Sequence, residues 1–177
     1  MASYYYFAAT LPVLRLHQKM PMSIDKFTEQ AETHLNRTDW QTLRCALTGT
    51  YSRHAMLKAY RSYASDLNTA LAKKRQVRLG FALDEDLQNQ TVPKELEAVA
   101  DELLERSDPL EAEMQFITLL WKRIDRLVGM KVFEFDALLG YGLKLLLLER
   151  VNIFTREVGQ ATFETLLGSL RSEIDQM

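Results

Sequence analysis

Three histidines and one cysteine are the side chains in this chain of 177 residues that could bind a transition metal or start nucleophilic catalysis. His17, His34 and His54 have no second His or Cys at the spacing that places two ligands on one helix face. Cys45 lies among apolar residues with no base marked beside it, so we expect a buried thiol that does not react. These residues predict neither a metal site nor a catalytic centre.

Other motifs that support catalysis or nucleotide binding are missing from the sequence. There is neither a GxxxxGK[ST] loop nor a GxGxxG loop to hold phosphate, and no serine lies in a nucleophile elbow. Asp84, Glu85 and Asp86 resemble the start of a calcium loop but lack its glycine and its terminal glutamate. We therefore expect no enzymatic activity and no cofactor. A helical hydrolase would need a deep pocket lined by carboxylates with perturbed pKa values.

The composition is that of an ordinary globular chain. Hydrophobic residues make up 47% and charged residues 26%, and the mass of 20.5 kDa allows a sizeable core. The net charge of −2 gives no general attraction to nucleic acid or anionic lipid. The single cysteine fits a reducing compartment, and the N-terminus has no signal-peptide pattern. We expect one helical domain over 1–177, located in the cytoplasm.

The most hydrophobic stretch, 133–159, is the segment that the other elements must position and cover. Its leucines and Tyr141 cover nearly the whole circumference of a helix, so this helix must be buried on most sides. Only twelve residues separate Asp136 from Glu149 and Lys144 interrupts them, whereas a membrane span needs about 20 apolar residues. The stretch predicts an all-α, multi-helix bundle around a buried helix at about 134–158.

The remaining segments predict helices that surround this central one. Ser23 is expected to cap a helix over 24–35, and Thr38 to cap a short helix that follows. Residues 51–79 contain neither Pro nor Gly, which predicts a long amphipathic helix ended by Gly80. Its inner stripe would be Met56, Tyr60, Tyr63, Leu67, Leu71 and Val77. Residues 81–92 predict a polar loop, and further helices are expected from Pro93, over 109–128 and over 161–174.

Charge is distributed unevenly along the chain. Residues 51–79 hold seven basic residues and one acidic residue, whereas residues 84–113 hold eleven acidic and two basic residues. Two solvated faces of opposite sign could help these helices pack side by side, or could form a dipolar surface that orients a partner. Tyr51, Tyr60 and Tyr63 interleave with the basic residues as in a nucleic-acid interface. Because Tyr60 and Tyr63 fall on the inner stripe, a role in the core is favoured.

The start of the chain, SYYYFAATLPVL, combines a run of three tyrosines with a small-residue segment and Leu-Pro. Periodicity leaves open whether this block is a strand or a short buried helix. The block resembles the start of a short bacterial protein family encoded among the subunits of V-type (archaeal-type) ATPases. The following MPMSIDKFTEQA also fits that opening.

A second resemblance involves the central stretch, FEFDALLGYGLKLLLLERVNI. It is similar to the closing region of the C-type subunit of V-type ATPases, which is called d in eukaryotes. The matching positions are Phe135, Asp136, Leu138, Tyr141, Lys144, Glu149, Asn152 and Ile153. The C-type subunit is an all-helical cap that seats the central rotor stalk on the membrane ring. This chain is about half the usual length of that subunit, lacks its threefold repeat and has Gly140 and Gly142 beside the tyrosine.

The resemblance implies a non-catalytic subunit or accessory protein of a V-type ATPase. It would act in ATP-driven ion transport as a C-like coupler between the central stalk and the membrane rotor ring, and would reach the membrane only through the complex. Candidate contact residues are Tyr4, Tyr5, Tyr6, Asp136, Tyr141, Lys144 and Glu149. The alternative is a helical adaptor that binds RNA or a protein through the basic helix 51–79, with Lys73, Lys74 and Arg75 as its contacts.

Overall fold

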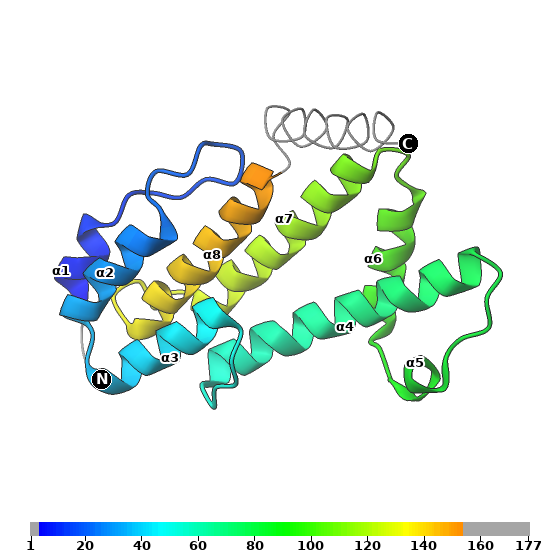
Figure 1. The fold of residues 1–177 in the computed structure, drawn as a ribbon, viewed down its shortest axis with the longest axis horizontal. Coiled ribbons are helices and arrows are strands. Elements are labelled where there is room, and N and C mark those ends of the chain that lie inside the picture. The colour runs from blue at the N-terminus through cyan, green and yellow to red at the C-terminus, as the bar shows by residue number, and fades with distance from the viewer. Residues whose placement is uncertain (1–3, 154–177) are drawn as a thin grey trace, which may run out of the picture.

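All regular structure in residues 4–153, the part of the chain that the computed structural model describes, is α-helical (Figure 1). This confirms the predicted all-α class. The helices in this range are α1 (Tyr5–Thr10), α2 (Ile24–His34), α3 (Arg37–Thr48), α4 (Ala55–Arg78), α5 (Glu85–Asn89), α6 (Lys94–Glu105), α7 (Pro109–Val128) and α8 (Phe135–Ile153).

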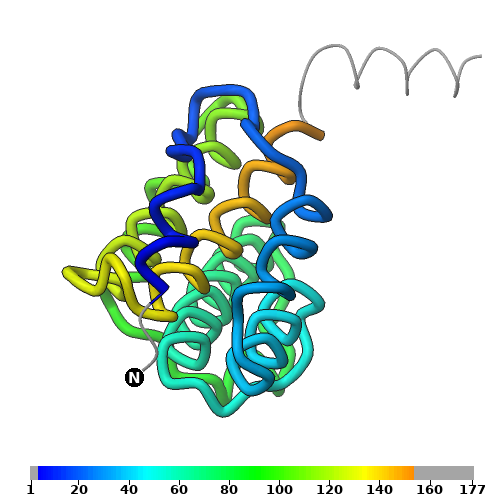
Figure 2. Tube along the Cα trace, turned by 90° about the vertical axis from the view of Figure 1, so that its left-hand side faces the viewer, coloured from blue at the N-terminus to red at the C-terminus, as the bar shows by residue number. Residues whose placement is uncertain are grey.

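Helix α8 is the centre of the bundle, as its leucine-rich sequence predicts. Its buried residues lie on all sides of the helix, because α7, α3 and α2 pack around it. Figure 1 shows α8 between α7 and the α2–α3 pair, and the view turned by 90° in Figure 2 shows α2 running beside it. The predicted end of the central helix near 158 and the predicted helix over 161–174 lie outside the described residues.

Helix α4 extends well beyond this central group. It packs against α7 and, in its second half, against α6 (Figure 1). The core is nonetheless continuous from Tyr4 at the start of α1 to Leu147 on α8. No helix in residues 4–153 has both the length and the apolar content needed to cross a bilayer.

Local sequence signals account for most helix ends. Ser23 Oγ accepts a hydrogen bond from the backbone N–H of Lys26, as predicted for a helix cap. Gly80 has a φ of +77°, and the N–H of Phe81 reaches back to the carbonyl oxygen of Gln76 at 3.0 Å. This left-handed ending of α4 is the one that the glycine predicted. Asp108 caps α7, with Pro109 in its first turn.

Four sequence predictions about the elements are wrong, the first being the start of α4, which lies at Ala55 and not at 51. The cap of α3 is Asn36, whose Oδ1 accepts from the Asp39 N–H at 2.9 Å, and not Thr38. The expected loop over 81–92 contains the short helix α5, which a hydrogen bond between Gln76 and Asp84 ties to α4. Val77 is 60% exposed, because the last turn of α4 projects past the helices that cover its inner stripe.

Candidate partner interface

Tyr4 is the buried member of the tyrosine run and ties three elements together. It is 7% exposed, and its Oη donates to Asp39 Oδ2 at 2.5 Å and accepts from Asn36 Nδ2 at 2.8 Å. Its backbone N–H donates to the carbonyl oxygen of Phe133 at 3.0 Å. Burial and the hydrogen bond to the Asp39 carboxylate raise the pKa of Tyr4 to about 12. Tyr4 thus fixes α1 to the start of α3 and to the α7–α8 loop.

Tyr5 and Tyr6 are exposed and join Phe133 in a cluster that we call the aromatic surface. The exposed fractions of these three residues are 50%, 84% and 45% respectively. The Tyr5 ring centroid lies 4.6 Å from that of Phe133 and 5.5 Å from that of Tyr6. Met130 and Val132 of the same loop are also exposed. Exposed aromatic side chains in contact with one another are typical of protein interfaces.

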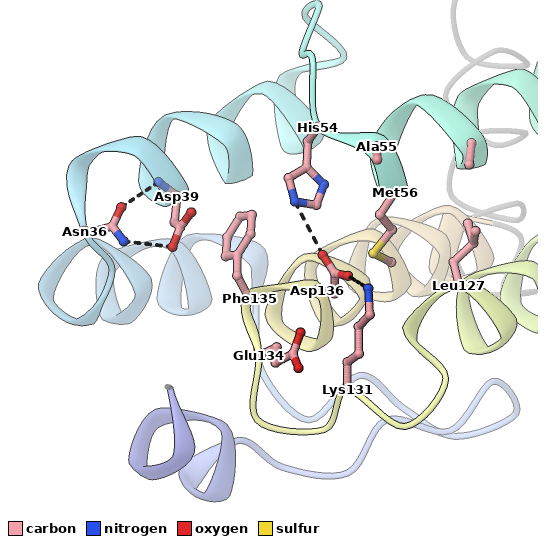
Figure 3. A pocket seen from close by; sticks show the side chains of 11 residues that line it. Asn36, Asp39, His54, Ala55, Met56, Leu127, Lys131, Glu134, Phe135 and Asp136 are labelled. Atoms are coloured by element: carbon pink, nitrogen blue, oxygen red, sulfur yellow. Dashed lines mark hydrogen bonds and ion pairs between the residues drawn. The ribbon is translucent and has the colours of Figure 1, made fainter. Parts of the chain in front are cut away.

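A cleft of about 720 Å³ lies beside this surface, between the starts of α3, α4 and α8 (Figure 3). We call it the acidic cleft because it contains three carboxylates from two separate parts of the chain. Its lining includes Asn36, Asp39, His54, Lys131, Glu134, Phe135 and Asp136.

Asp136 holds one side of the acidic cleft together. Its Oδ2 lies 2.5 Å from Lys131 Nζ and its Oδ1 lies 3.4 Å from His54 Nε2. The hydrogen bond from Lys131 to this carboxylate, with its negative charge, raises the pKa of Lys131. Asp136 also lies in the first turn of α8, where a negative charge complements the helix dipole. This candidate contact residue is therefore mostly covered, and it links α4 and the α7–α8 loop to α8.

The other candidate residues of α8 are spread along the helix. Tyr141 is half-buried, and its Oη donates to the carbonyl oxygen of Pro12 at 3.0 Å. Its burial raises the pKa of this phenol to about 12. Lys144 lies 2.5 Å from Asp125 and sits over the Trp121 ring, whereas Glu149 is exposed. The structure does not gather these residues into one site with the tyrosine run, apart from Asp136.

Three basic residues in the second half of α4, Lys73, Lys74 and Arg78, contact the acidic segment 84–113. Lys74 Nζ lies 2.7 Å from Asp101 Oδ2 on α6, and Lys73 Nζ donates to the carbonyl oxygen of Gln90 at 2.5 Å. Arg75 is exposed beside them. These contacts fit the interpretation in which opposite charges help α4 and α6 pack side by side.

A second exposed apolar segment, which we call the α4 tip, consists of Val77, Leu79 and Phe81. It lies where α4 ends, at the opposite end of the molecule's long axis from α1 and the α7–α8 loop (Figure 1). The described part of the protein thus carries exposed apolar groups at both ends.

The acidic cleft was not predicted from the sequence. A local signal existed, since Asn36 and Asp39 have the spacing of a helix cap and its third residue. The approach of His54 and Glu134 to this cap depends on tertiary packing, which no local pattern encodes. No group of three or more His, Cys, Asp or Glu side chains in the described residues is arranged to hold a metal ion.

Comparison with known proteins found no match to this chain among protein families, curated proteins or solved structures.

Proposed function

We propose that this protein is a non-catalytic subunit or accessory protein of a V-type ATPase, acting as a C-like coupler between the central stalk and the membrane ring. The observation that carries the proposal is the position of the aromatic surface. Tyr5 and Tyr6 belong to the segment SYYYFAATLP, on which the family resemblance rests. Both side chains are exposed, with Tyr5 against Phe133 and Tyr6 against Tyr5. A resemblance in exposed aromatic residues points to a shared partner more directly than one in core residues would.

The second support is the arrangement of exposed apolar groups. A coupler must contact one partner at each end, and the aromatic surface and the α4 tip lie at opposite ends of the long axis (Figure 1). In this proposal the aromatic surface binds one neighbouring subunit and the α4 tip binds another. The buried helix α8 provides the rigid link between α1 and the rest of the bundle.

Co-purification from native membranes tests the proposal. A tagged copy of the full chain should purify with the catalytic subunits of the ATPase, and Tyr5→Ala/Tyr6→Ala should lose most of this association. Tyr51→Ala is the matched control, because Tyr51 is an equally exposed tyrosine on the α3–α4 loop. Absence of the wild-type protein from the purified complex would rule the proposal out. If Tyr51→Ala lost as much association as Tyr5→Ala/Tyr6→Ala, the aromatic surface would not be the binding site.

A further inference from the structure

Two of the three carboxylates in the acidic cleft form no ion pair in the described part of the chain, although the charge of Glu134 acts on the nearby Lys131 ammonium. Asp136 forms an ion pair with Lys131, and its other oxygen lies 3.4 Å from the His54 imidazole. Asp39 and Glu134 take part in none of the ion pairs within residues 4–153. The cleft therefore presents negative charge to whatever enters it.

The Asp39 carboxylate is held in place rather than free to turn away. Its Oδ2 accepts hydrogen bonds from Tyr4 Oη at 2.5 Å and from Asn36 Nδ2 at 2.9 Å. Neither donor carries a charge at neutral pH, so the carboxylate is positioned without being neutralised. A carboxylate that is fixed in place and not neutralised is a strong acceptor for a cationic donor, because its side chain loses little conformational entropy on binding.

An aromatic ring stands between the carboxylates. Figure 3 shows Phe135 between Asp39 on one side and the His54–Asp136 pair on the other, with Glu134 nearby. Phe135 is only 9% exposed and packs edge-on with Tyr4 and His54, so its ring is an apolar wall of the cleft and offers no open face for stacking. A guanidinium carries five N–H donors in a planar fork and can therefore donate to two separate carboxylates at once. A lysine ammonium is a compact charge without this fork, so a pair of separate carboxylates favours arginine over lysine.

The acidic cleft and the aromatic surface are continuous. Phe133, Glu134 and Phe135 are consecutive residues, of which the first belongs to the aromatic surface and the other two line the cleft. Tyr4 joins the two features, since its backbone contacts Phe133 and its ring meets Phe135 edge-on at 6.5 Å. A protein segment that covers the aromatic surface would place a neighbouring side chain at the mouth of the cleft.

We infer that the acidic cleft receives an arginine side chain of the partner protein that docks on the aromatic surface, with Asp39 and Glu134 binding the guanidinium. This inference rests on the proposed function for the identity of the partner as an ATPase subunit. The requirement for an arginine beside an apolar or aromatic residue rests on the geometry of the cleft alone.

A direct binding experiment tests the cleft without the ATPase. The ¹⁵N-labelled full chain is titrated in NMR with the blocked dipeptides acetyl-Phe-Arg-amide, acetyl-Phe-Lys-amide and acetyl-Phe-Gln-amide. The arginine peptide should shift the Asn36 side-chain amide and the Phe135 backbone amide in a saturable way, more tightly than the lysine peptide. Glu134→Gln and Asp39→Asn should each weaken it about tenfold, the effect expected for losing one hydrogen bond to a charged group. Glu149→Gln, an exposed carboxylate on α8 outside the cleft, is the control.

Three outcomes would overturn the inference. The glutamine peptide could bind as well as the arginine peptide, or Glu134→Gln and Asp39→Asn could both bind like the wild type. Sedimentation of the protein alone could show a dimer that Glu134→Gln weakens, which would make a second copy of this chain the occupant.

The membrane experiment separates this inference from the proposed function. If Glu134→Lys stays with the ATPase while Tyr5→Ala/Tyr6→Ala is lost, the arginine contact is wrong and the proposed function stands. If the wild type is absent from the ATPase but binds the arginine peptide selectively, the proposed function fails and the assignment of the cleft stands.

Discussion

A β-carbon built on Gly140 would lie 2.5 Å from Cγ2 of Val128 and 3.2 Å from Cγ2 of Ile124. Carbon atoms pack at about 3.5–4.0 Å, so α7 and α8 lie closer together here than any larger residue permits. Gly142 serves the other side of α8, where a β-carbon would lie 3.1 Å from Leu43 and 3.2 Å from Phe27. The two glycines thus allow α8 to pack closely against α7 on one face and against α2 and α3 on the other. Both residues are unfavourable in a helix, so this close packing must offset their low helix propensity.

Gly140→Ala should destabilise the protein. Alanine gains about 1 kcal/mol of helix propensity, but the overpacking against Val128 costs about 1–3 kcal/mol. We expect a lower urea midpoint than for the wild type, with Gly142→Ala closer to the wild type because it meets the ends of flexible side chains. Adding Val128→Ala to Gly140→Ala should recover part of the loss, which a double-mutant cycle measures. A Gly140→Ala protein as stable as the wild type would contradict this account of the α7–α8 contact.

The sequence predicted the framework better than the site, for physical reasons. The leucines of 138–148 predicted the buried helix because burial on all sides leaves a composition that no exposed helix has. Gly140 and Gly142 are unfavourable in an isolated helix, and only the packed structure shows which neighbours they accommodate. Local propensity could not reveal this, since the compensation comes from other elements.

The tyrosine run shows the same limit at the candidate interface. Its hydrophobic character indicated an ordered block, but three consecutive tyrosines carry no period that separates buried from exposed positions. Tyr4 is the buried one because its hydroxyl group hydrogen-bonds to Asn36 and Asp39, which lie some thirty residues further along the chain. The acidic cleft has the same origin. Asp39 on α3 and Glu134 in the α7–α8 loop are far apart in the sequence, and only the packing of the core brings them together.

Raising the pH should destabilise the folded protein through Tyr4 and Tyr141. Both phenols have a folded-state pKa of about 12 against an ordinary value of 10. Between these values the unfolded state has released protons that the folded state retains, so the stabilisation is complete below about pH 10 and is lost as the pH rises towards about 12. Urea midpoints across this range should fall less steeply in Tyr4→Phe and Tyr141→Phe than in the wild type. Parallel curves for all three proteins would show that these phenols do not carry the effect.

The Lys74–Asp101 pair should contribute modestly to the packing of α4 against α6. Its nitrogen–oxygen distance is 2.7 Å, but both side chains are partly exposed, and such pairs contribute about 0.2–1 kcal/mol. A double-mutant cycle of Lys74→Met and Asp101→Ala should give a coupling of this size at low salt and less at about 1 M NaCl. The matched cycle of Lys58→Met with Asp101→Ala should give none, because Lys58 lies at the other end of α4. A salt-independent coupling would mean that apolar packing, and not charge, links the two positions.

Asn36 should matter more for stability than its neighbour Thr38, although both are good capping residues. Asn36 Oδ1 caps α3 by accepting from the Asp39 N–H, and Asn36 Nδ2 donates to Tyr4 Oη and to Asp39 Oδ2. Asn36→Ala removes the cap, which costs about 0.5–2 kcal/mol, and also loosens the contact that holds α1. Thr38→Ala leaves the cap intact and should change stability by less than about 0.5 kcal/mol.

Hydrogen exchange distinguishes this arrangement from a simple loss of helix stability. Because Tyr4 joins α1 to the start of α3, Asn36→Ala should speed the exchange of the Ala8 amide in α1 as well as of Trp40 at the start of α3. Faster exchange in α3 alone would show that α1 is held by its other contacts, such as the Tyr4 backbone bond to Phe133. Equal destabilisation by Thr38→Ala would instead return the cap to the position that the sequence pattern first indicated.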